Sequence, residues 1–241
     1  LALALLAAAT GRPASEPTVT LNPFVISGGA DDSYAPTETL SGTRLKSPVK
    51  DVPSALSIIS ADMLSDLGAL NFNDVLDFLP STARYQSNEG DVDNNGQRTG
   101  NPYTVRGFRS DSLTTNFFTA LTPIDAYNTS RFTFTRGPNS ILFGNGSLSG
   151  VSSATTKRAQ TNRSLEAVQL SVGSWRNYRA TLDVNRPLSK NAALRLASVW
   201  GDSDGWRMKD SDRRKAAFLT GTLRPFRDTE IRLEGEYGTN S

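Results

Sequence analysis

The sequence contains neither histidine nor cysteine. This absence excludes histidine-based acid–base catalysis, Ser-His-Asp triads, thiol nucleophiles, disulfides and the usual zinc sites. An excess of one charge is also lacking, since 26 Lys and Arg against 24 Asp and Glu give a net charge of +2. Bulk charge therefore gives no case for nucleic-acid binding. Only carboxylate or lysine chemistry remains, so we expect no enzyme, no cofactor and no metal site.

Long hydrophobic runs are missing as well. The apolar run "LALALLAAAT" is too short for a transmembrane helix, which needs about 20 apolar residues. It fits the hydrophobic region of a secretory signal with an A-x-A pattern at Ala7 and Ala9. We therefore expect residues 1–14 to be a partial signal peptide that lacks its start. A short Ala/Leu helix is the alternative.

Residues 15–42 are rich in Pro, Gly, Ser, Thr and Asp, which is typical of an extended linker. The segment "LNPFVISG", Leu21–Gly28, is an apolar island within this linker. A strand-forming segment in a flexible tail is suited to pairing with the edge of a partner's sheet. Pairing within its own domain is the open alternative.

Residues 43–160 predict a small α+β domain. "SALSIIS", Ser54–Ser60, is a short buried-strand pattern, and Ser60 is placed to cap a helix that runs through Leu67 before Gly68. "NFNDVLDFLP", Asn71–Pro80, predicts a second short helix ended by its proline. Two further strands are expected at Tyr103–Phe108 and Arg131–Gly137.

Residues 161–241 alternate between apolar and polar side chains, as in "NYRATLDVN" and "TEIRLEGEYG". Segments of about 10 residues with this pattern are typical of transmembrane β-barrel strands. A soluble antiparallel sheet with one dry and one wet face alternates in the same way. The aromatic residues beside the expected turns favour the membrane, because barrels carry aromatic girdles at the interfaces; they are Trp175, Tyr178, Trp200 and Trp206.

We expect four connections between these strands, at Ser174–Asn177, Arg186–Asn191, Gly201–Arg214 and Pro225–Asp228. The resulting strands, roughly five, are fewer than the eight or so of the smallest closed barrels. The overall prediction is an α+β domain followed by the first antiparallel strands of an incomplete transmembrane β-barrel.

The segment "RGPNSILFGNGSLSG", Arg136–Gly150, is rich in glycine. Its spacing G-x-G-x-x-x-G is one residue longer than a dinucleotide fingerprint, and no helix pattern follows at Ser152–Thr156. The glycines are better explained as backbone turns that need a positive φ. Nucleotide binding is therefore not expected.

At this point the sequence resembles a family, the TonB-dependent outer-membrane receptors. The resemblance covers Leu40–Arg158 and includes "VRGF", with Arg106 and Gly107, and "RFTFTRGPNSILFGNGSLSGVSSATTKR". Within the second segment, the residues that match the pattern of the family's plug domain are Arg136, Gly137, Pro138, Ser140, Leu142, Gly144, Gly146, Gly150, Thr156 and Lys157.

The resemblance implies a plug domain inside a barrel of about 22 strands in the outer membrane, in contact with its lipid. It implies energy-coupled import of a scarce ligand, most often a ferric siderophore, driven by TonB of the inner-membrane complex. By position, the segment that pairs with TonB, the TonB box, is Pro23, Phe24, Val25, Ile26 and Ser27. The Gly/Asp-rich residues Gly28–Ser33 give this segment reach.

The polar stretch Tyr85–Pro102 is a long loop without hydrophobic periodicity, as functional loops often are. The resemblance implies that plug loops at Tyr85–Asn101 and around Phe108–Asn116 face the ligand, so the candidate ligand-facing residues are Tyr85, Gln86, Arg98 and Arg109. Their polar and cationic groups suit an anionic chelate.

Two other predictions concern charges and rival functions. Arg106 and Arg136 are expected to pair with carboxylates of the strand face such as Glu234 and Glu236. A passive porin or adhesin is the first rival function. A periplasmic enzyme that uses carboxylates such as Asp74 and Asp77 is the second rival, although capping or solvation explains those residues better.

Overall fold

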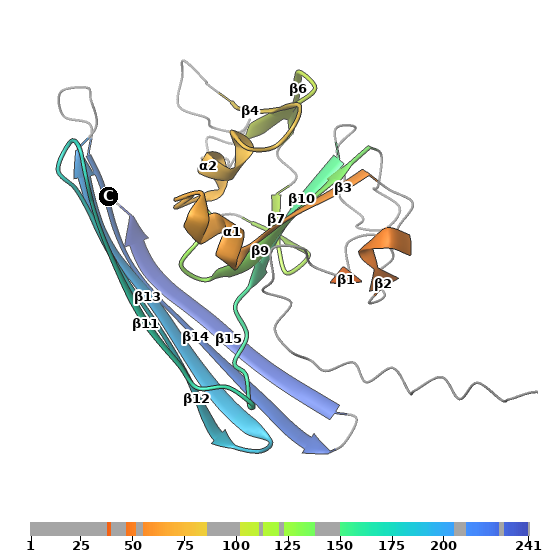
Figure 1. Ribbon diagram of the computed structural model, residues 1–241, viewed down its shortest axis with the longest axis vertical. Helices are drawn as coiled ribbons and strands as arrows, with labels where there is room; N and C mark the ends of the chain where they lie inside the picture. The colour runs from red at the N-terminus through yellow and green to blue at the C-terminus, as the bar shows by residue number, and fades with distance from the viewer. Residues whose placement is uncertain are drawn as a thin grey trace, which may run out of the picture. The chain divides into compact units, whose positions relative to one another are not determined.

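The computed structural model describes residues 38–39, 47–51, 55–85, 102–110, 113–120, 123–137, 150–204, 211–226 and 229–240. They form an α+β domain (residues 55–156) and a five-stranded antiparallel sheet, the long sheet (residues 165–240), within one compact unit (Figure 1). Ahead of them lie the paired strands β1 (Glu38–Thr39) and β2 (Ser47–Pro48) and a 3-10 helix, Val49–Asp51. The expected signal peptide and Pro23–Ser27 lie outside the described residues and stay predictions.

A five-stranded sheet forms the centre of the α+β domain, in the order β3-β9-β10-β7-β8. Strand β10 pairs in parallel with β7 and antiparallel with β9, and β3 pairs with β9 at the edge. The bounds are Ala55–Ser60 for β3, Thr129–Arg136 for β9, Gly150–Thr156 for β10, Leu113–Thr115 for β7 and Phe118–Thr119 for β8.

Two short helices follow β3, as the sequence predicts. The Ser60 side chain caps α1 (Ala61–Asp66) by accepting a hydrogen bond from the Met63 N–H at 3.3 Å. Helix α2 (Phe72–Leu76) is shorter than the predicted Asn71–Pro80, because the chain tightens into three-residue turns after Leu76. Among the described residues, neither helix has the length and hydropathy that a membrane span requires.

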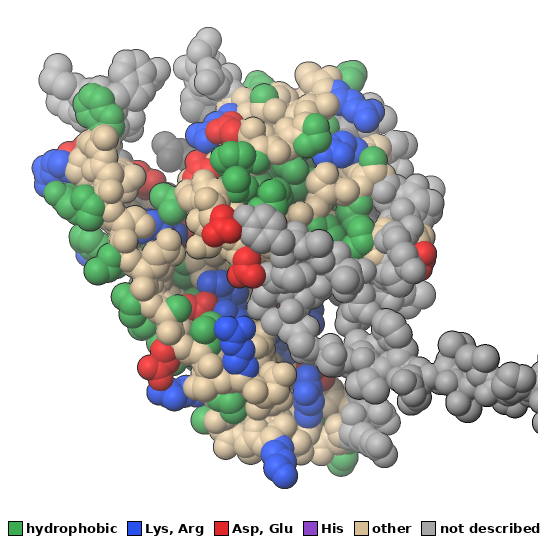
Figure 2. Space-filling model, viewed as in Figure 1, with side chains coloured by type: hydrophobic (Ala, Val, Ile, Leu, Met, Phe, Trp, Pro, Cys, Tyr) green, Lys and Arg blue, Asp and Glu red, His purple; other side chains and the backbone are tan. Residues whose placement is uncertain are grey.

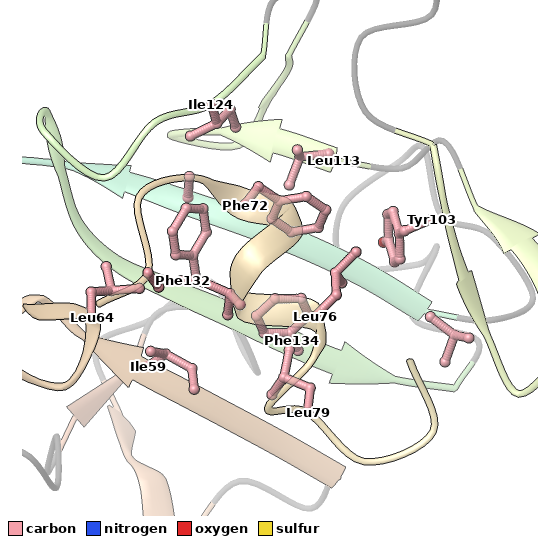
Figure 3. Close-up of a cluster of buried hydrophobic side chains, with 14 residues drawn as sticks. Ile59, Leu64, Phe72, Leu76, Leu79, Tyr103, Leu113, Ile124, Phe132 and Phe134 are labelled. Atoms are coloured by element: carbon pink, nitrogen blue, oxygen red, sulfur yellow. The ribbon is translucent and has the colours of Figure 1, made fainter. Parts of the chain in front are cut away.

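The core of this domain packs around Phe72 of α2. Its ring lies 5.3 Å from that of Tyr103 and 5.7 Å from those of Phe132 and Phe134, measured between centroids (Figure 3). Edge-on and offset ring pairs of this kind stabilise beyond the area they bury. Phe72, Val75 and Leu76 of α2 are buried, so they form the face of this helix that covers the sheet.

The "VRGF" segment is a hairpin rather than the single strand predicted at Tyr103–Phe108. Strands β5 (Tyr103–Val105) and β6 (Phe108–Ser110) pair antiparallel, and β4 (Thr82–Arg84) pairs with β5. The cause is the Arg106–Gly107 dipeptide, whose φ angles of 53° and 80° form a two-residue hairpin turn.

The long sheet consists of neighbouring antiparallel hairpins in sequence order. The strands are β11 (Leu165–Gly173), β12 (Asn177–Ser189), β13 (Ala192–Asp204), β14 (Ser211–Phe226) and β15 (Thr229–Asn240).

Two of the predicted connections are wrong in extent. Strand β12 continues through the predicted turn Arg186–Asn191 to Ser189, with a register shift between Pro187 and Ser189, because proline offers no N–H to the ladder. The predicted loop Gly201–Arg214 is largely strand, since β13 and β14 stay paired as far as Asp204 and Ser211. Polar residues at strand ends resemble a loop in sequence, yet the backbone ladder continues through them.

The first turn of the long sheet lies where the sequence places it. The Asn177 N–H donates to the Ser174 carbonyl at 3.3 Å, which closes a turn between β11 and β12. Trp175 and Arg176 at its centre have φ angles of 61° and 52°, which is unusual for bulky side chains. These two exposed residues therefore hold a strained backbone at one end of the sheet.

The glycine-rich segment connects β9 to β10, and a strand rather than a helix follows it, which excludes a dinucleotide fold. Gly137 and Gly150 have φ angles of 98° and 122°, as expected of turn glycines. The predicted positions Pro138, Gly144 and Gly146 lie outside the described residues.

We predict that Gly150→Ala destabilises the α+β domain. A Cβ at this position would lie 2.1 Å from the Thr135 carbonyl oxygen, and the backbone conformation alone costs a non-glycine residue roughly 1–3 kcal/mol. Scanning calorimetry of the purified protein measures the change. Gly235→Ala is the control, because nothing lies within 4 Å of its Cβ. Equal unfolding temperatures for the two variants would contradict the prediction.

Candidate functional site

The long sheet has an apolar face that is exposed to its surroundings. Hydrophobic side chains are spaced along its edge in Figure 2, over the strands of the long sheet in Figure 1. On the inner strands β13 and β14, this outer face exposes Leu194, Leu196, Trp200, Leu219 and Leu223, at 39–52% of full exposure. A soluble sheet buries this side. The exposure of a continuous apolar face therefore favours a hydrocarbon environment over water.

Aromatic residues lie at one end of this outer face. Trp175, Tyr178 and Trp200 are between 44% and 63% exposed. Trp175 and Tyr178 lie at the turn between β11 and β12, and Trp200 lies on β13 opposite Ala180, near the same end of the sheet. Amphipathic rings are favoured where hydrocarbon meets water. The fourth predicted residue, Trp206, lies outside the described residues.

We predict that Leu219→Arg destabilises the long sheet in a bilayer by about 2–4 kcal/mol, because an Arg at the bilayer midplane of a barrel costs about that much. Leu219 is half-exposed near the middle of β14. The matched control is Leu223→Arg, on the same outer face but nearer the strand end, where a cost of about 0–1 kcal/mol is expected. Equilibrium unfolding in lipid vesicles measures both, and equal costs would contradict a bilayer around this face.

The inner face of the long sheet is polar and binds the α+β domain. Asp125, only 3% exposed, accepts hydrogen bonds from Arg179 of β12 at 2.5 and 3.2 Å. Arg214 of β14 lies 3.5 Å from the same carboxylate, and the Tyr127 N–H donates to it at 2.9 Å. Two arginines of the sheet thus neutralise and orient one buried carboxylate of the domain.

Two carboxylates of β15 bind neutral donors of the α+β domain. Glu234 accepts from the Asn116 amide at 2.6 Å and from the Thr156 hydroxyl at 2.9 Å. Glu236 accepts from the Tyr127 hydroxyl at 2.6 Å and from the Asn128 amide at 3.0 Å. Burial raises the pKa of the Tyr127 phenol, and the Glu236 hydrogen bond raises it further, so this hydroxyl stays a neutral donor.

The predicted partners of these carboxylates are wrong. Arg136 instead donates to the Ser57 hydroxyl at 2.7 Å inside the α+β domain, and Arg106 is exposed at the hairpin turn. The prediction located the acceptors on the sheet but not the donors. Neutral amide and hydroxyl groups satisfy the carboxylates without burying additional positive charge.

A third group of contacts lies where the chain passes from β10 to β11. Asp183 of β12, which is buried, accepts from both Nε and Nη2 of Arg195 at 2.8 Å, and from Lys157 Nζ at 2.8 Å. The paired geometry of Arg195 is the bidentate arrangement that carboxylates bind most strongly. Lys157 is thereby fixed to the long sheet.

A polar cavity of about 600 Å³ lies between α2 and the inner face of the long sheet. Asp125, Arg179 and Arg214 contribute to its lining, and these three groups satisfy one another. Asn71 and Asp74, which also line it, form the capping box of α2. Capping, together with the Arg84–Asp74 and Arg84–Asp77 ion pairs, accounts for the two aspartates that we considered for an enzyme.

The predicted ligand-facing residues are only partly within the described residues. The Arg109 guanidinium on β6 lies over the Tyr85 ring, 4.7 Å from its centroid, so the structure brings these two together. Arg109 is exposed and Tyr85 is partly so. Gln86 and Arg98 lie outside the described residues and stay predictions.

Sequence reasoning did not single out the residues that join the domain to the sheet, among them Asp125, Tyr127, Arg179 and Arg195. The alternation of β12 does place Arg179 and Asp183 together on one polar face. The alternation does not indicate which residues bind these side chains, because the partners are distant in the chain. Lys157 and Asp183 are 26 residues apart, and Tyr127 and Glu236 are 109 residues apart.

Comparisons with known proteins agree on one family. Residues 48–151 match the family model described as TonB-dependent Receptor Plug Domain. The chain is 30% identical over 216 residues to the metal-pseudopaline receptor CntO of Pseudomonas aeruginosa, covering 88% of this chain and 30% of that protein. It is 26% identical to the catecholate siderophore receptor Fiu of Escherichia coli K12, covering 83% and 27%.

Solved structures show the same fold. The structure of FpvA of P. aeruginosa bound to heterologous pyoverdines matches with a TM-score of 0.77 at 22% identity, covering 88% of this chain and 28% of that one. The closed form of Fiu from E. coli matches with a TM-score of 0.75 at 23% identity, covering 86% and 29%.

The chain spans about 30% of the length of the curated relatives just named. Within that span, the matched region covers residues 55–151 of the α+β domain, and the polar inner face of the long sheet binds this domain, while the outer face is apolar. The α+β domain is therefore a plug, the long sheet is part of a barrel wall, and the chain belongs to the TonB-dependent receptors of the outer membrane.

Proposed function

We propose that the complete protein imports a ferric siderophore across the outer membrane, with energy supplied through TonB. The observation that carries this proposal is the plug bound across the polar face of a wall whose other face is apolar. A wall of that kind without a plug is a passive pore, whereas a bound plug needs an input of energy to open. The similar proteins CntO, FpvA and Fiu support the substrate class, since their names specify metal-pseudopaline, ferripyoverdine and catecholate siderophores.

The domain organisation that we propose follows from this function. Residues 1–14 belong to a signal peptide, residues 15–42 carry the TonB box, residues 43–160 form the plug, and residues 161–241 form strands of the barrel. Pro23–Ser27 is the proposed box, because it combines strand-forming residues with a glycine-rich spacer.

We propose that Tyr85 and Arg109, together with Gln86 and Arg98, face the ligand. An exposed guanidinium stacked on a phenol ring offers both charge-assisted hydrogen bonds and an aromatic surface. An anionic metal chelate with aromatic or hydroxamate groups matches that combination.

Affinity measurements on the complete receptor test the ligand class and this site. We expect Arg109→Gln to weaken binding of the best ferric siderophore by about tenfold, the effect of losing one hydrogen bond to a charged group. The panel contains siderophores, cobalamin and oligosaccharides. Arg224→Gln is the control, because Arg224 is exposed and pairs with Glu230 of the wall. Preferential binding of cobalamin or an oligosaccharide would overturn the substrate class.

A further inference from the structure

The segment that connects plug and wall, residues 157–164 (the connecting segment), is bound to the wall through its backbone. We propose that Asn185 of β12 is a positioning residue that clamps the connecting segment, so that this end of the plug stays fixed while the N-terminal side is displaced. The inference rests on the proposed energy-coupled uptake for the displacement, and on geometry alone for the clamp.

Asn185 uses both ends of its amide on the connecting segment. Its Oδ1 accepts from the Gln160 N–H at 2.9 Å, and its Nδ2 donates to the Gln160 carbonyl at 2.9 Å and to the Arg163 carbonyl. The side chain is 2% exposed. An amide matches one backbone N–H and its carbonyl in the way a neighbouring strand does, which neither a carboxylate nor an aliphatic side chain reproduces.

Neighbouring strands extend the clamp. Arg195 of β13 donates from Nη1 to the Arg158 carbonyl at 3.1 Å, and Thr222 of β14 donates to the Ala159 carbonyl at 3.0 Å. Ala159 is 5% exposed, so its carbonyl has little access to water. Side chains from three wall strands therefore satisfy consecutive backbone groups of the connecting segment, which buried backbone requires.

The N-terminal side of the plug is attached differently. The wall contacts described above come from plug and connecting residues between Asn116 and Arg163. In contrast, β3 is an edge strand that pairs, among the described strands, with β9 alone. Removing an edge strand leaves the β9–β10 and β10–β7 pairs intact. A pull from the N-terminus thus reaches β3 before any other strand of the five-stranded plug sheet, at the far end of the plug chain from the clamp.

The test uses the complete receptor in cells with and without TonB, supplied with its ferric siderophore. The variant is Asn185→Asp, which places a carboxylate against two carbonyl oxygens, and the matched control is Asn177→Asp on the same strand and the same inward face. The readout is sensitivity to vancomycin, a hydrophilic antibiotic too large for general porins.

We expect Asn185→Asp to raise vancomycin sensitivity by about tenfold, as the loss of buried hydrogen bonds implies, only in cells that contain TonB. Asn177→Asp should leave sensitivity unchanged. A leak of equal size without TonB indicates a general folding defect and overturns the proposal, and so does the absence of any leak.

A second measurement tests the clamp independently of energy coupling. The sequence has no cysteine, so Ala159→Cys introduces a single thiol into this region. We expect it to be protected from a periplasmic maleimide when Asn185 is present and to be labelled when Asn185→Asp is added. Equal labelling overturns the clamp, whereas wild-type uptake that does not depend on TonB overturns the proposed function instead.

Discussion

Deletion of Pro23–Ser27 from the complete receptor is expected to abolish uptake of the ferric siderophore while leaving its binding at the cell surface unchanged. The segment is short, apolar and β-branched, and it precedes the Gly/Asp-rich residues Gly28–Ser33, so it is suited to joining the sheet edge of TonB as an added strand. Without that strand the plug receives no force. The bound plug then keeps the barrel closed.

Uptake and surface binding of radioactive ferric siderophore, measured on the same cells, separate the two effects. Deletion of Ser15–Val19 is the matched control, because it removes the same number of residues from the same linker and leaves the candidate box in place. Uptake that persists without Pro23–Ser27 would indicate a passive pore, which is the first rival function.

Asp183→Asn is expected to destabilise the bound plug by about 3–5 kcal/mol, the usual cost of removing one partner of a buried ion pair. The Asp183 carboxylate is the common acceptor for Arg195 and for Lys157 of the connecting segment. The variant leaves these two buried cations close together without an anion between them. The wall should therefore lose its hold on the end of the plug.

Scanning calorimetry of the purified receptor in detergent measures this loss as an earlier unfolding transition of the plug. The control is Asp202→Asn on the neighbouring strand β13, whose 3.4 Å ion pair with Arg213 is more exposed. Its removal should cost about 0–1 kcal/mol, as for other surface pairs. If the two variants unfold alike, the Asp183 cluster does not hold the plug.

The local elements were predictable because short-range rules fix them. Ser60 begins α1 through a hydrogen bond to a residue three positions away, and Gly68 has the positive φ expected of a glycine where that helix ends. The alternation of β12 likewise separates its two faces without reference to any other part of the chain. The predicted loop bounds were wrong where polar composition suggests a loop but the strands stay paired. At the charged end of β13, for example, the hydrogen-bonded ladder with β14 continues to Asp204.

By itself, the sequence determined the family, the order of the elements and the division of each wall strand into a polar and an apolar face, because these depend on neighbouring residues. Only the tertiary structure decided which polar groups meet. Glu236 binds Tyr127 and Asn128, and Asn185 binds Gln160. These pairs are far apart in the chain, and the register of the wall strands brings each wall side chain level with its partner. A shift of that register by one residue would move the Glu236 and Asn185 side chains to the opposite face of the wall.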